Sequence, residues 1–349
     1  MRFTYTRHII ATDTLIRDCL KQLNELANDA ILFVANNEKK LIGSLTDGDI
    51  RRGLLKGFTI DDRVENFLQE NPKYIQRGNY NIEQIIEYRE AGFRILPLVD
   101  KNGVVINVIN FRNVKSYLPV DTLIMAGGRG ERLLPLTETT PKPLLKVGDK
   151  PIILHNLDRL ISFGIDDFWI SVKYLGSQIV DFIGDGHEKG ISIKYIHEEI
   201  PLGTIGSISL IPEFEHDHIL VTNSDLLTNL DYEKFFIDFV NSGADMAIAT
   251  IPYNVNIPYA IIETDLNVIT NFQEKPTYTY FANAGIYLFK KDVAQLVPKE
   301  TYFNATDLLN LLIKKNKKVI SFPLRGYWLD IGKHEDYKKA NEDIKFINF

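Results

Sequence analysis

A chain of 349 residues is longer than one hydrophobic core usually serves, so its length predicts two domains. Hydrophobic residues make up 45% of the sequence and charged residues 25%, which is typical of a soluble globular protein. The net charge of −6 argues against a dedicated nucleic-acid-binding protein, because no basic excess is present to neutralise phosphates, but a small anionic substrate needs only a few local cations.

The sequence contains one cysteine, Cys19, which permits no intrachain disulfide and fits a reducing compartment. The first residues, MRFTYTRHIIATDT, lack the apolar core of a signal peptide. No segment approaches the roughly 18 apolar residues of a membrane span. These features predict a cytoplasmic protein with no membrane partner.

Residues 1–119 contain a diverged internal repeat, in which Ala30–Ile50 aligns without gaps on Arg94–Val114, 64 residues further along. Each copy is predicted to form an amphipathic helix, two apolar strands joined by a polar turn, and the start of a second helix. A copy of this size cannot easily bury its own apolar faces. We therefore expect the two copies to pack on each other in an α+β module.

After Pro119 the pattern changes to alternating strands and helices, so we place a domain boundary between residues 1–119 and 120–349. This alternation predicts an α/β domain with a doubly wound, mostly parallel sheet. Such sheets bind ligands at the carboxyl ends of their strands. The predicted strands are 121–125, 168–172, 191–196 and 218–223, and the predicted helices are 152–163, 178–183 and one after Thr204.

A glycine-rich loop follows the first of these strands, within LIMAGGRGERLLPLTETTPKPLL (123–145). Gly127, Gly128 and Gly130 allow the backbone to turn sharply and to direct several N–H groups at one anion. Arg132 follows the loop, and Lys142 lies between two prolines. Neither the Walker pattern nor GxGxxG fits this segment. It predicts a triphosphate-binding loop, and the alternative is a glycine turn beside unrelated surface charges.

This segment resembles the signature of the sugar-1-phosphate nucleotidyltransferases, and the resemblance extends from about Val120 to the C-terminus. It implies a Rossmann-like nucleotidyltransferase domain, with Ala126 beside the glycines at the nucleotide. Glu131 departs from the family, in which many members carry Thr. Four further segments match in order: PLGT at 201–204, NSDLL at 223–227, FQEKP at 272–276 with NAGIYLF at 283–289, and YWLDIG at 327–332.

Asp225 ends the apolar strand ILVTNSD, and Asp330 follows two aromatic residues in a segment that is predicted to be buried. Two carboxylates brought together could hold Mg²⁺, a hard cation that takes few protein oxygens. From the residues alone, two ordinary loop aspartates are the alternative. The resemblance implies that this pair is the metal site.

The resemblance also assigns residues to the two substrates. Glu274 is implied to bind the sugar hydroxyls and Lys275 the sugar phosphate, although neighbouring Glu and Lys are often a surface ion pair. Gly203 and Thr204 are implied to lie beside the nucleotide base and ribose; a helix capped by Thr204 is the alternative. The remaining residues of the implied sugar pocket are Tyr259, Asn283 and Gly285.

In the N-terminal module, GSLTDGDIRRGLL (43–55) resembles the nucleotide-binding end of a CBS repeat. The resemblance implies that Thr46 meets a phosphate and Asp49 the ribose of a regulatory nucleotide. The second copy carries Asn110 and Asn113 at these positions, which favours one site or none. The alternative is a module that is purely structural or that dimerises, and dimerisation would make the protein a homo-oligomer.

Together these implications predict Mg²⁺-dependent nucleotidyl transfer from a nucleoside triphosphate to a sugar 1-phosphate, with release of pyrophosphate. The CBS pair and the ending FPLRGYWLDIGKHEDYKKAN are similar to the glucosamine-1-phosphate guanylyltransferases of bacterial legionaminic-acid pathways, which implies GTP and glucosamine 1-phosphate. The alternatives are mannose-1-phosphate guanylyl transfer, another pairing of nucleotide and sugar, and a catalytically silent nucleotide sensor. The expected catalytic residues are Arg132, Lys142, Asp225, Lys275 and Asp330.

Overall fold

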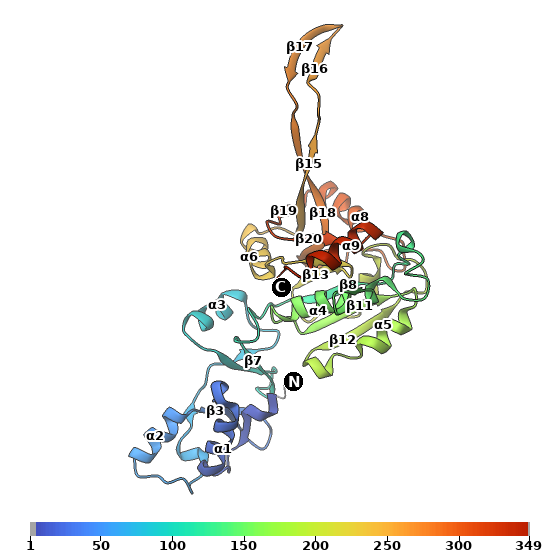
Figure 1. Cartoon of the computed structure of the whole chain (residues 1–349). Coiled ribbons are helices and arrows are strands. Elements are labelled where there is room, and N and C mark those ends of the chain that lie inside the picture. The colour runs from blue at the N-terminus through green and yellow to red at the C-terminus, as the bar shows by residue number, and fades with distance from the viewer. Residues whose placement is uncertain (1–4, 348–349) are drawn as a thin grey trace. The chain divides into compact units, whose positions relative to one another are not determined.

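The computed structural model describes residues 5–347, and the chain forms two compact units (Figure 1). The first unit contains the chain up to Pro119 together with Leu160–Asp167 and Asp185–Ser192. The second contains Val120–Arg159, Phe168–Gly184 and the chain from Ile193 onward. The expected boundary coincides with the end of the first N-terminal segment. The two short later segments of the first unit were not indicated by the sequence.

The N-terminal part of the first unit contains one arrangement twice. β1 pairs parallel with β2 and β2 antiparallel with β3, and β5, β6 and β7 repeat these pairings. The third strand is followed by α2 in the first copy but by a turn at residues 111–113 in the second, so the helix start expected there is not formed. The elements are β1 (Ile9–Ala11), α1 (Ile16–Leu26), β2 (Leu32–Ala35), β3 (Leu41–Leu45), α2 (Asp47–Leu55), β4 (Gln69–Glu70), β5 (Ile75–Gln76), α3 (Ile82–Glu90), β6 (Ile95–Val99) and β7 (Val105–Asn110).

The two copies pack on each other, as the repeat predicts. Phe33 of β2 is buried against Ile95 and Val108 of the second copy. The Leu41 N–H donates a hydrogen bond of 3.0 Å to the Gly103 carbonyl, which joins the turns of the two copies. The two copies therefore share one small buried cluster, although the first copy also buries a larger apolar cluster of its own around Ile16, Leu32 and Leu45.

The second unit is built on a seven-stranded sheet of order β12-β11-β8-β13-β18-β15-β19. β8 is parallel to β11 and β13, and β15 is parallel to β19, whereas β18 is antiparallel to both of its neighbours. The expected mostly parallel α/β sheet is confirmed. The strands are β8 (Asp121–Met125), β9 (Lys146–Val147), β10 (Lys150–Pro151), β11 (Asp167–Val172), β12 (Ser192–His197), β13 (His218–Asn223), β14 (Leu226–Thr228), β15 (Met246–Asn256), β16 (Ile261–Asp265), β17 (Val268–Gln273), β18 (Thr277–Lys290), β19 (Val319–Pro323) and β20 (Trp328–Asp330).

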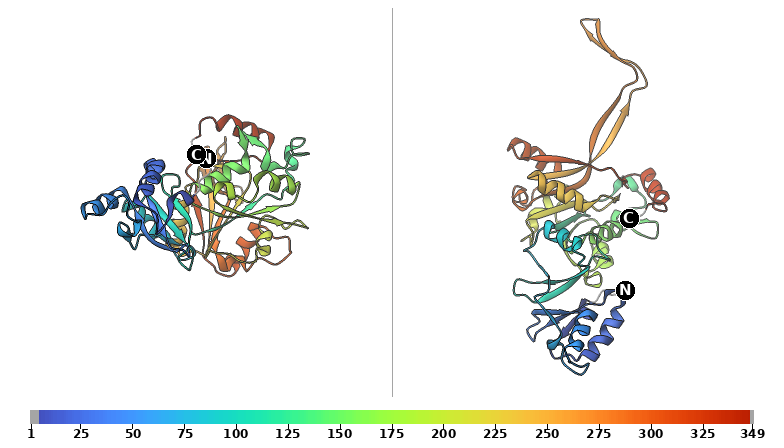
Figure 2. Two further views of the ribbon diagram at one scale, coloured as in Figure 1. Left: turned by 90° about the horizontal axis from the view of Figure 1, so that it is seen from below. Right: turned by 90° about the vertical axis from the view of Figure 1, so that its left-hand side faces the viewer.

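Helices lie on both faces of this sheet (Figure 2). On one face, Val221 and Phe289 of the sheet are buried against Leu308 and Leu312 of α8. The helix expected after Thr204 is a short 3₁₀ helix, η7 (Gly206–Leu210), which packs in the same cluster. None of the helices within residues 5–347 is long and apolar enough to cross a membrane. The α-helices are α4 (Ile152–Ile161), α5 (Gly176–Ile183), α6 (Tyr232–Ser242), α7 (Lys291–Ala294), α8 (Ala305–Lys314) and α9 (His334–Asp343).

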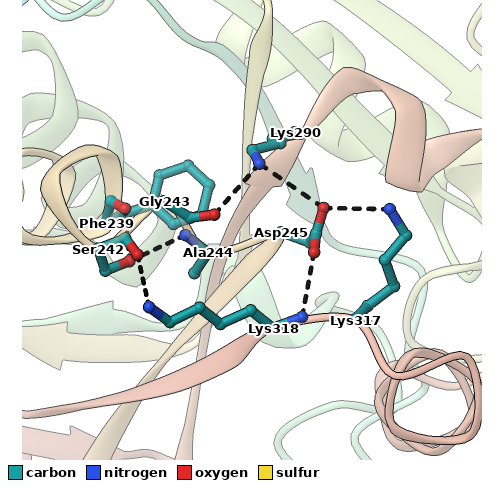
Figure 3. A network of polar contacts seen from close by, with 8 residues as sticks. All are labelled: Phe239, Ser242, Gly243, Ala244, Asp245, Lys290, Lys317 and Lys318. Atoms are coloured by element: carbon teal, nitrogen blue, oxygen red, sulfur yellow. Dashed lines mark hydrogen bonds and ion pairs between the residues drawn. The ribbon is translucent and has the colours of Figure 1, made fainter.

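β15 and β18 continue out of the sheet as a two-stranded ribbon that ends in the hairpin β16–β17 (Figures 1 and 2). At the opposite end of these strands, Asp245 binds three lysines that precede β19 or end β18 (Figure 3). Its carboxylate lies 3.3 Å from Lys317 Nζ and 3.6 Å from Lys290 Nζ, and it accepts a hydrogen bond from the Lys318 N–H at 3.1 Å. This cluster ties β15, β18 and β19 together where β15 begins.

Candidate active site

A pocket lies at the carboxyl ends of β8, β11 and β13. These parallel strands end at the same edge of the sheet, so the residues that follow them face a common space. The pocket comprises two adjoining cavities of about 610 and 360 Å³. Both cavities are lined by Gly127, Gly128, Gly130, Lys142, Lys173 and Pro201.

The glycine-rich loop forms one wall of the pocket, and its binding of a triphosphate stays a prediction. Gly130 has φ +66°, a left-handed conformation that favours glycine. A Cβ atom there would lie 3.0 Å from Thr137 Cγ2 and 3.1 Å from Lys142 Cβ, so the loop packs closely on the segment that carries Lys142. Arg132, also predicted, is exposed and lines the larger cavity.

The structure brings together Lys142, Asp225 and Asp330. β14 pairs antiparallel with β20, with Leu226 opposite Asp330, which places Asp225 beside Asp330. The Ile331 N–H also donates to the Asp225 carbonyl at 3.2 Å. Lys142 Nζ forms an ion pair with Asp225 and lies 3.5 Å from Asp330 Oδ1. One ammonium group therefore contacts both carboxylates.

The two carboxylates have the environment of a cation site. Burial raises the pKa of Asp330 to about 6; the adjacent Asp225 carboxylate acts in the same direction, and Lys142 opposes it. The Oδ1 atoms of Asp225 and Asp330 are buried and have no hydrogen-bond partner among the described residues. Asp330 Oδ1 also lies 3.5 Å from the Lys142 ammonium, and a buried acceptor oxygen without a hydrogen bond is costly unless a nearby charge compensates it. A hard divalent cation with few protein ligands fits this pair of oxygens.

Asn156 on α4 holds the loop that carries Asp225. Its buried side-chain amide donates to the carbonyls of Ser224 and Leu226, at 3.3 and 2.9 Å, which flank Asp225 in the chain. It also donates to the Ile152 carbonyl at 3.0 Å. Asn156 is not among the residues predicted from the sequence. A single Asn in an apolar helix carries no local signal for such a role.

Lys173 and Glu198 are two further residues of the pocket that the sequence analysis missed. Lys173 directly follows β11, and the position after a buried strand, which identified Asp225, could have identified it as well. Its Nζ donates to the Glu198 carbonyl at 3.0 Å. The Glu198 carboxylate accepts hydrogen bonds from the Ser171 hydroxyl and, at 3.2 Å, from the Leu202 N–H, so it fixes the loop before Gly203.

Gly203 and Thr204 line the smaller cavity, and they also contact the start of α8. Gly203 has φ +76°, and a Cβ atom there would lie 2.7 Å from the Phe303 carbonyl oxygen. Thr204 Oγ1 accepts a hydrogen bond of 2.9 Å from the Ala305 N–H at the first turn of α8. Thr204 therefore caps α8, which lies far along the chain, and not the 3₁₀ helix η7 that follows Thr204 in the sequence.

The residues expected to form the sugar pocket lie in two separate places in the structure. Gly285 packs on Asn223, which lines the smaller cavity: a Cβ atom at Gly285 would be 2.6 Å from the Asn223 side-chain amide. Asn283 accepts a hydrogen bond from the Gly285 N–H at 2.9 Å. Tyr259, Glu274 and Lys275 instead lie on the ribbon and are exposed. The structure does not bring them to Asp225 and Asp330, because β15 and β18 remain paired beyond the sheet.

In the first unit, Thr46 and Asp49 form the N-terminal cap of α2. The Asp49 carboxylate accepts hydrogen bonds from the Thr46 N–H, at 2.8 Å, and from the Thr46 hydroxyl, at 2.6 Å, and it pairs with Arg52. These contacts form a capping box that satisfies the free N–H groups of the first turn. Binding of a regulatory nucleotide at these two residues stays a prediction.

The sequence of this chain is similar to those of known proteins. The model of the family described as "Nucleotidyl transferase" matches residues 121–346. The mannose-1-phosphate guanyltransferase of Debaryomyces hansenii is 32% identical over 224 residues, which are 62% of this chain and 62% of that protein. The matched part of the chain thus spans less than two thirds of that relative.

Solved structures show the same fold for nearly two thirds of the chain. HddC from Yersinia pseudotuberculosis superposes with a TM-score of 0.51 and 28% sequence identity, covering 64% of this chain and 99% of HddC. HddC complexed with GMP-PN superposes with a TM-score of 0.50 and 27% identity. The likeness therefore extends over nearly the whole of HddC.

Proposed function

Since this chain belongs to the nucleotidyl transferase family, we propose that it is an enzyme that transfers a nucleotidyl group from a nucleoside triphosphate to a sugar 1-phosphate. The observation that carries the proposal is the contact of Lys142 with the neighbouring carboxylates of Asp225 and Asp330, beside a glycine-rich loop. Phosphoryl chemistry needs mainly alignment and neutralisation of charge, and such a pocket offers both.

In the proposed reaction, a phosphate oxygen of the sugar 1-phosphate attacks the α-phosphorus of the nucleotide. The bond between the α-phosphorus and the oxygen that bridges to the β-phosphorus breaks, and pyrophosphate leaves with that electron pair. No covalent bond to the protein forms. Gly127, Gly128 and Gly130 receive the triphosphate, Lys142 binds the nucleotide phosphates, and Arg132 binds the leaving pyrophosphate.

Asp225 and Asp330 would hold Mg²⁺, which when bound neutralises charge on the phosphate oxygens. The support for this assignment is that their buried Oδ1 atoms have no hydrogen-bond partner among the described residues. Lys275 is assigned to the sugar phosphate and Glu274 to the sugar hydroxyls, with Tyr259, Asn283 and Gly285 in the same sugar site and Gly203 and Thr204 at the base and ribose.

We propose GTP as the nucleotide. The similarity to a mannose-1-phosphate guanyltransferase and the complex of HddC with GMP-PN both support a guanine nucleotide. Glucosamine 1-phosphate is proposed as the sugar substrate, and mannose 1-phosphate is the second candidate because of that same relative.

The test is to incubate the full-length protein with Mg²⁺, each of GTP, UTP, TTP and CTP, and each of glucosamine, mannose and glucose 1-phosphate, and to measure pyrophosphate. We expect release with GTP and glucosamine 1-phosphate, and none when the sugar phosphate is omitted. Release with another pair corrects the substrates only. Nucleotide binding without release from any pair contradicts the proposed function and favours a silent nucleotide sensor.

A further inference from the structure

The ribbon formed by residues 252–281 exposes an unusual number of large apolar side chains. Five of them are aromatic, and each is 58% or more exposed. An isolated two-stranded ribbon is at best marginally stable in water, because it has no second layer on which to bury a face. The exposed apolar residues are Tyr253, Val255, Tyr259, Ile262, Leu266, Val268, Ile269, Phe272, Tyr280 and Phe281.

The stem of the ribbon, where β15 pairs with β18, has one apolar face and one mainly polar face. Tyr253 lies opposite Tyr280 and Val255 opposite Tyr278, so these four side chains share one face. The other face carries Phe281 opposite Pro252, and two Asn–Thr pairs that form cross-strand hydrogen bonds of 2.8 and 2.9 Å. Alternation of apolar and polar residues along each strand is typical of a strand pair that packs one of its two faces on another surface.

The direction of the stem is fixed where it leaves the sheet. Gly285 packs directly on Asn223, and Trp328 Nε1 donates to the Ala284 carbonyl at 2.9 Å. On the other strand, the Thr250 carbonyl accepts from the Leu324 N–H at 2.7 Å, and the Thr250 hydroxyl bonds Ser321 at 2.8 Å. The base of the stem therefore cannot swing without breaking buried contacts.

With the stem in place, the ribbon holds Glu274 and Lys275 away from the pocket of its own chain. Lys275 is eight positions from Asn283, which at about 3.3 Å per residue corresponds to roughly 26 Å. The ladder is interrupted at residues 257–260 and 274–276, and Lys275 has φ +43°. A bend at this interruption moves the β16–β17 hairpin, but it leaves Lys275 at the end of the stem.

We propose that the ribbon of one copy docks on the pocket of a second copy, where its Glu274 and Lys275 complete the site for the sugar phosphate. The inference rests on the proposed function, which assigns the sugar phosphate to Lys275. A twofold axis lets each copy give one ribbon and receive one, so the assembly closes as a dimer with two complete sites.

The exposed area is of the size that such a dimer needs. Four of the five aromatic side chains, all except Phe281 on the other face of the stem, offer roughly 480 Å² per chain, if each exposes about 60% of a surface near 200 Å². A stable interface buries about 800 Å² per partner, and the aliphatic residues of the ribbon can supply the remainder. Docking therefore removes a large apolar surface from water at the same time as it completes the site.

Complementation between two impaired variants tests the shared site. Lys275→Ala and Asp225→Asn chains are co-expressed at full length with different affinity tags, and the mixed dimers are isolated through both tags. In the mixed dimer the intact Asp225 pocket receives the intact Lys275 ribbon. We expect about half of the wild-type kcat/KM for the sugar phosphate, whereas each variant alone is strongly impaired.

The matched control is a mixed dimer of Lys142→Ala and Asp225→Asn chains. Both substitutions lie in the pocket, so each site carries one defect and no recovery is expected. A Lys275→Ala and Asp225→Asn dimer that stays as impaired as this control overturns the proposal, as does failure to isolate any mixed dimer.

A second measurement does not depend on activity. Light scattering on a sizing column should show a dimer for the wild-type protein and a monomer for Phe272→Asp, which alters an exposed residue of the ribbon. Phe182→Asp, at a 52% exposed phenylalanine on α5, is the control and should remain dimeric. A monomeric wild-type protein overturns the docking. If instead the wild-type dimer is inactive with every substrate pair, the proposed function fails and the docking stands.

Discussion

Asp225 and Asp330 come from segments that are distant in the sequence, and the pairing of β14 with β20 places them side by side. Each has one buried oxygen without a hydrogen-bond partner among the described residues. The ammonium group of Lys142 pairs with both. The positive charge of Lys142 therefore offsets the repulsion between the two carboxylates. Substitutions that remove one of these charges should have large effects on activity.

Asp225→Asn should lower kcat/KM by more than about a hundredfold, because a bound cation is worth several kcal/mol of charge stabilisation in such reactions. The melting temperature should change little, since the substitution also relieves repulsion with Asp330. Asp231→Asn is the matched control; Asp231 caps α6 by accepting from the Lys234 N–H, and asparagine caps equally well. Near wild-type activity of Asp225→Asn in Mg²⁺ would contradict the metal assignment, and EDTA should stop the wild-type reaction.

The affinity for Mg²⁺ or Mn²⁺ should depend on pH through Asp330. Its pKa is raised from 3.8 to about 6, so below that pH the carboxyl binds a proton, and the proton competes with the cation. The affinity should therefore fall by up to about tenfold per pH unit below pH 6 and level off above it. Mn²⁺ titrations at several pH values measure this, and Asp330→Asn should bind weakly at every pH. Equal wild-type affinity at pH 5 and pH 8 would show that Asp330 is not a ligand.

At the scale of elements, α4 positions the loop between β13 and β14 through Asn156. Asn156→Ala leaves the carbonyls of Ser224 and Leu226 without this donor, and we expect a loss of stability of about 1–3 kcal/mol. The freer loop should lower cation affinity by about 10- to 100-fold, and excess Mg²⁺ should restore much of the activity. Asn341→Ala is the control: it removes the side-chain oxygen that accepts a hydrogen bond from the Gly148 N–H, and it should lower stability without changing cation affinity. Unchanged cation affinity in Asn156→Ala would assign Asn156 to folding alone.

At the scale of the whole molecule, the first unit includes segments that lie within the transferase part of the chain. The Lys115 N–H donates to the Ser162 carbonyl at 2.6 Å, and the Leu118 N–H donates to the Phe163 carbonyl at 3.2 Å. A protein that begins at Phe111 keeps these bonds, whereas one that begins at Val120 loses them. We expect the longer protein to melt at a higher temperature and to aggregate less, and both to retain nucleotidyl transfer where they stay soluble.

Calorimetry and pyrophosphate release on the two truncated proteins measure this difference. Equal melting temperatures would show that residues 111–119 add nothing to the fold of the transferase part. A soluble, folded protein from Phe111 onward that has no activity would show that the N-terminal repeat contributes to the active site.

The repeat, the mostly parallel sheet and the glycine-rich loop could all be predicted from the sequence. Each depends on neighbours in the chain: apolar residues at regular spacing, turns, and glycines where the backbone must turn. The position of Asp225 could be predicted equally well, because it lies two residues after a buried parallel strand, at the edge of the sheet where such folds bind ligands. Family resemblance added Asp330, which no local pattern singles out.

Contacts between distant segments were decided only by the tertiary structure. The support from Asn156, the cap that Thr204 provides to α8, and the separation of Lys275 from Gly285 all depend on which strands pair and where the pairing ends. The sequence shows whether a residue is apolar or polar. Its burial and its long-range hydrogen bonds depend on which distant segment packs against it. The ribbon is the clearest case, because its strands are ordinary β sequence and only their continued pairing beyond the sheet moves Glu274 and Lys275 away from Asp225 and Asp330.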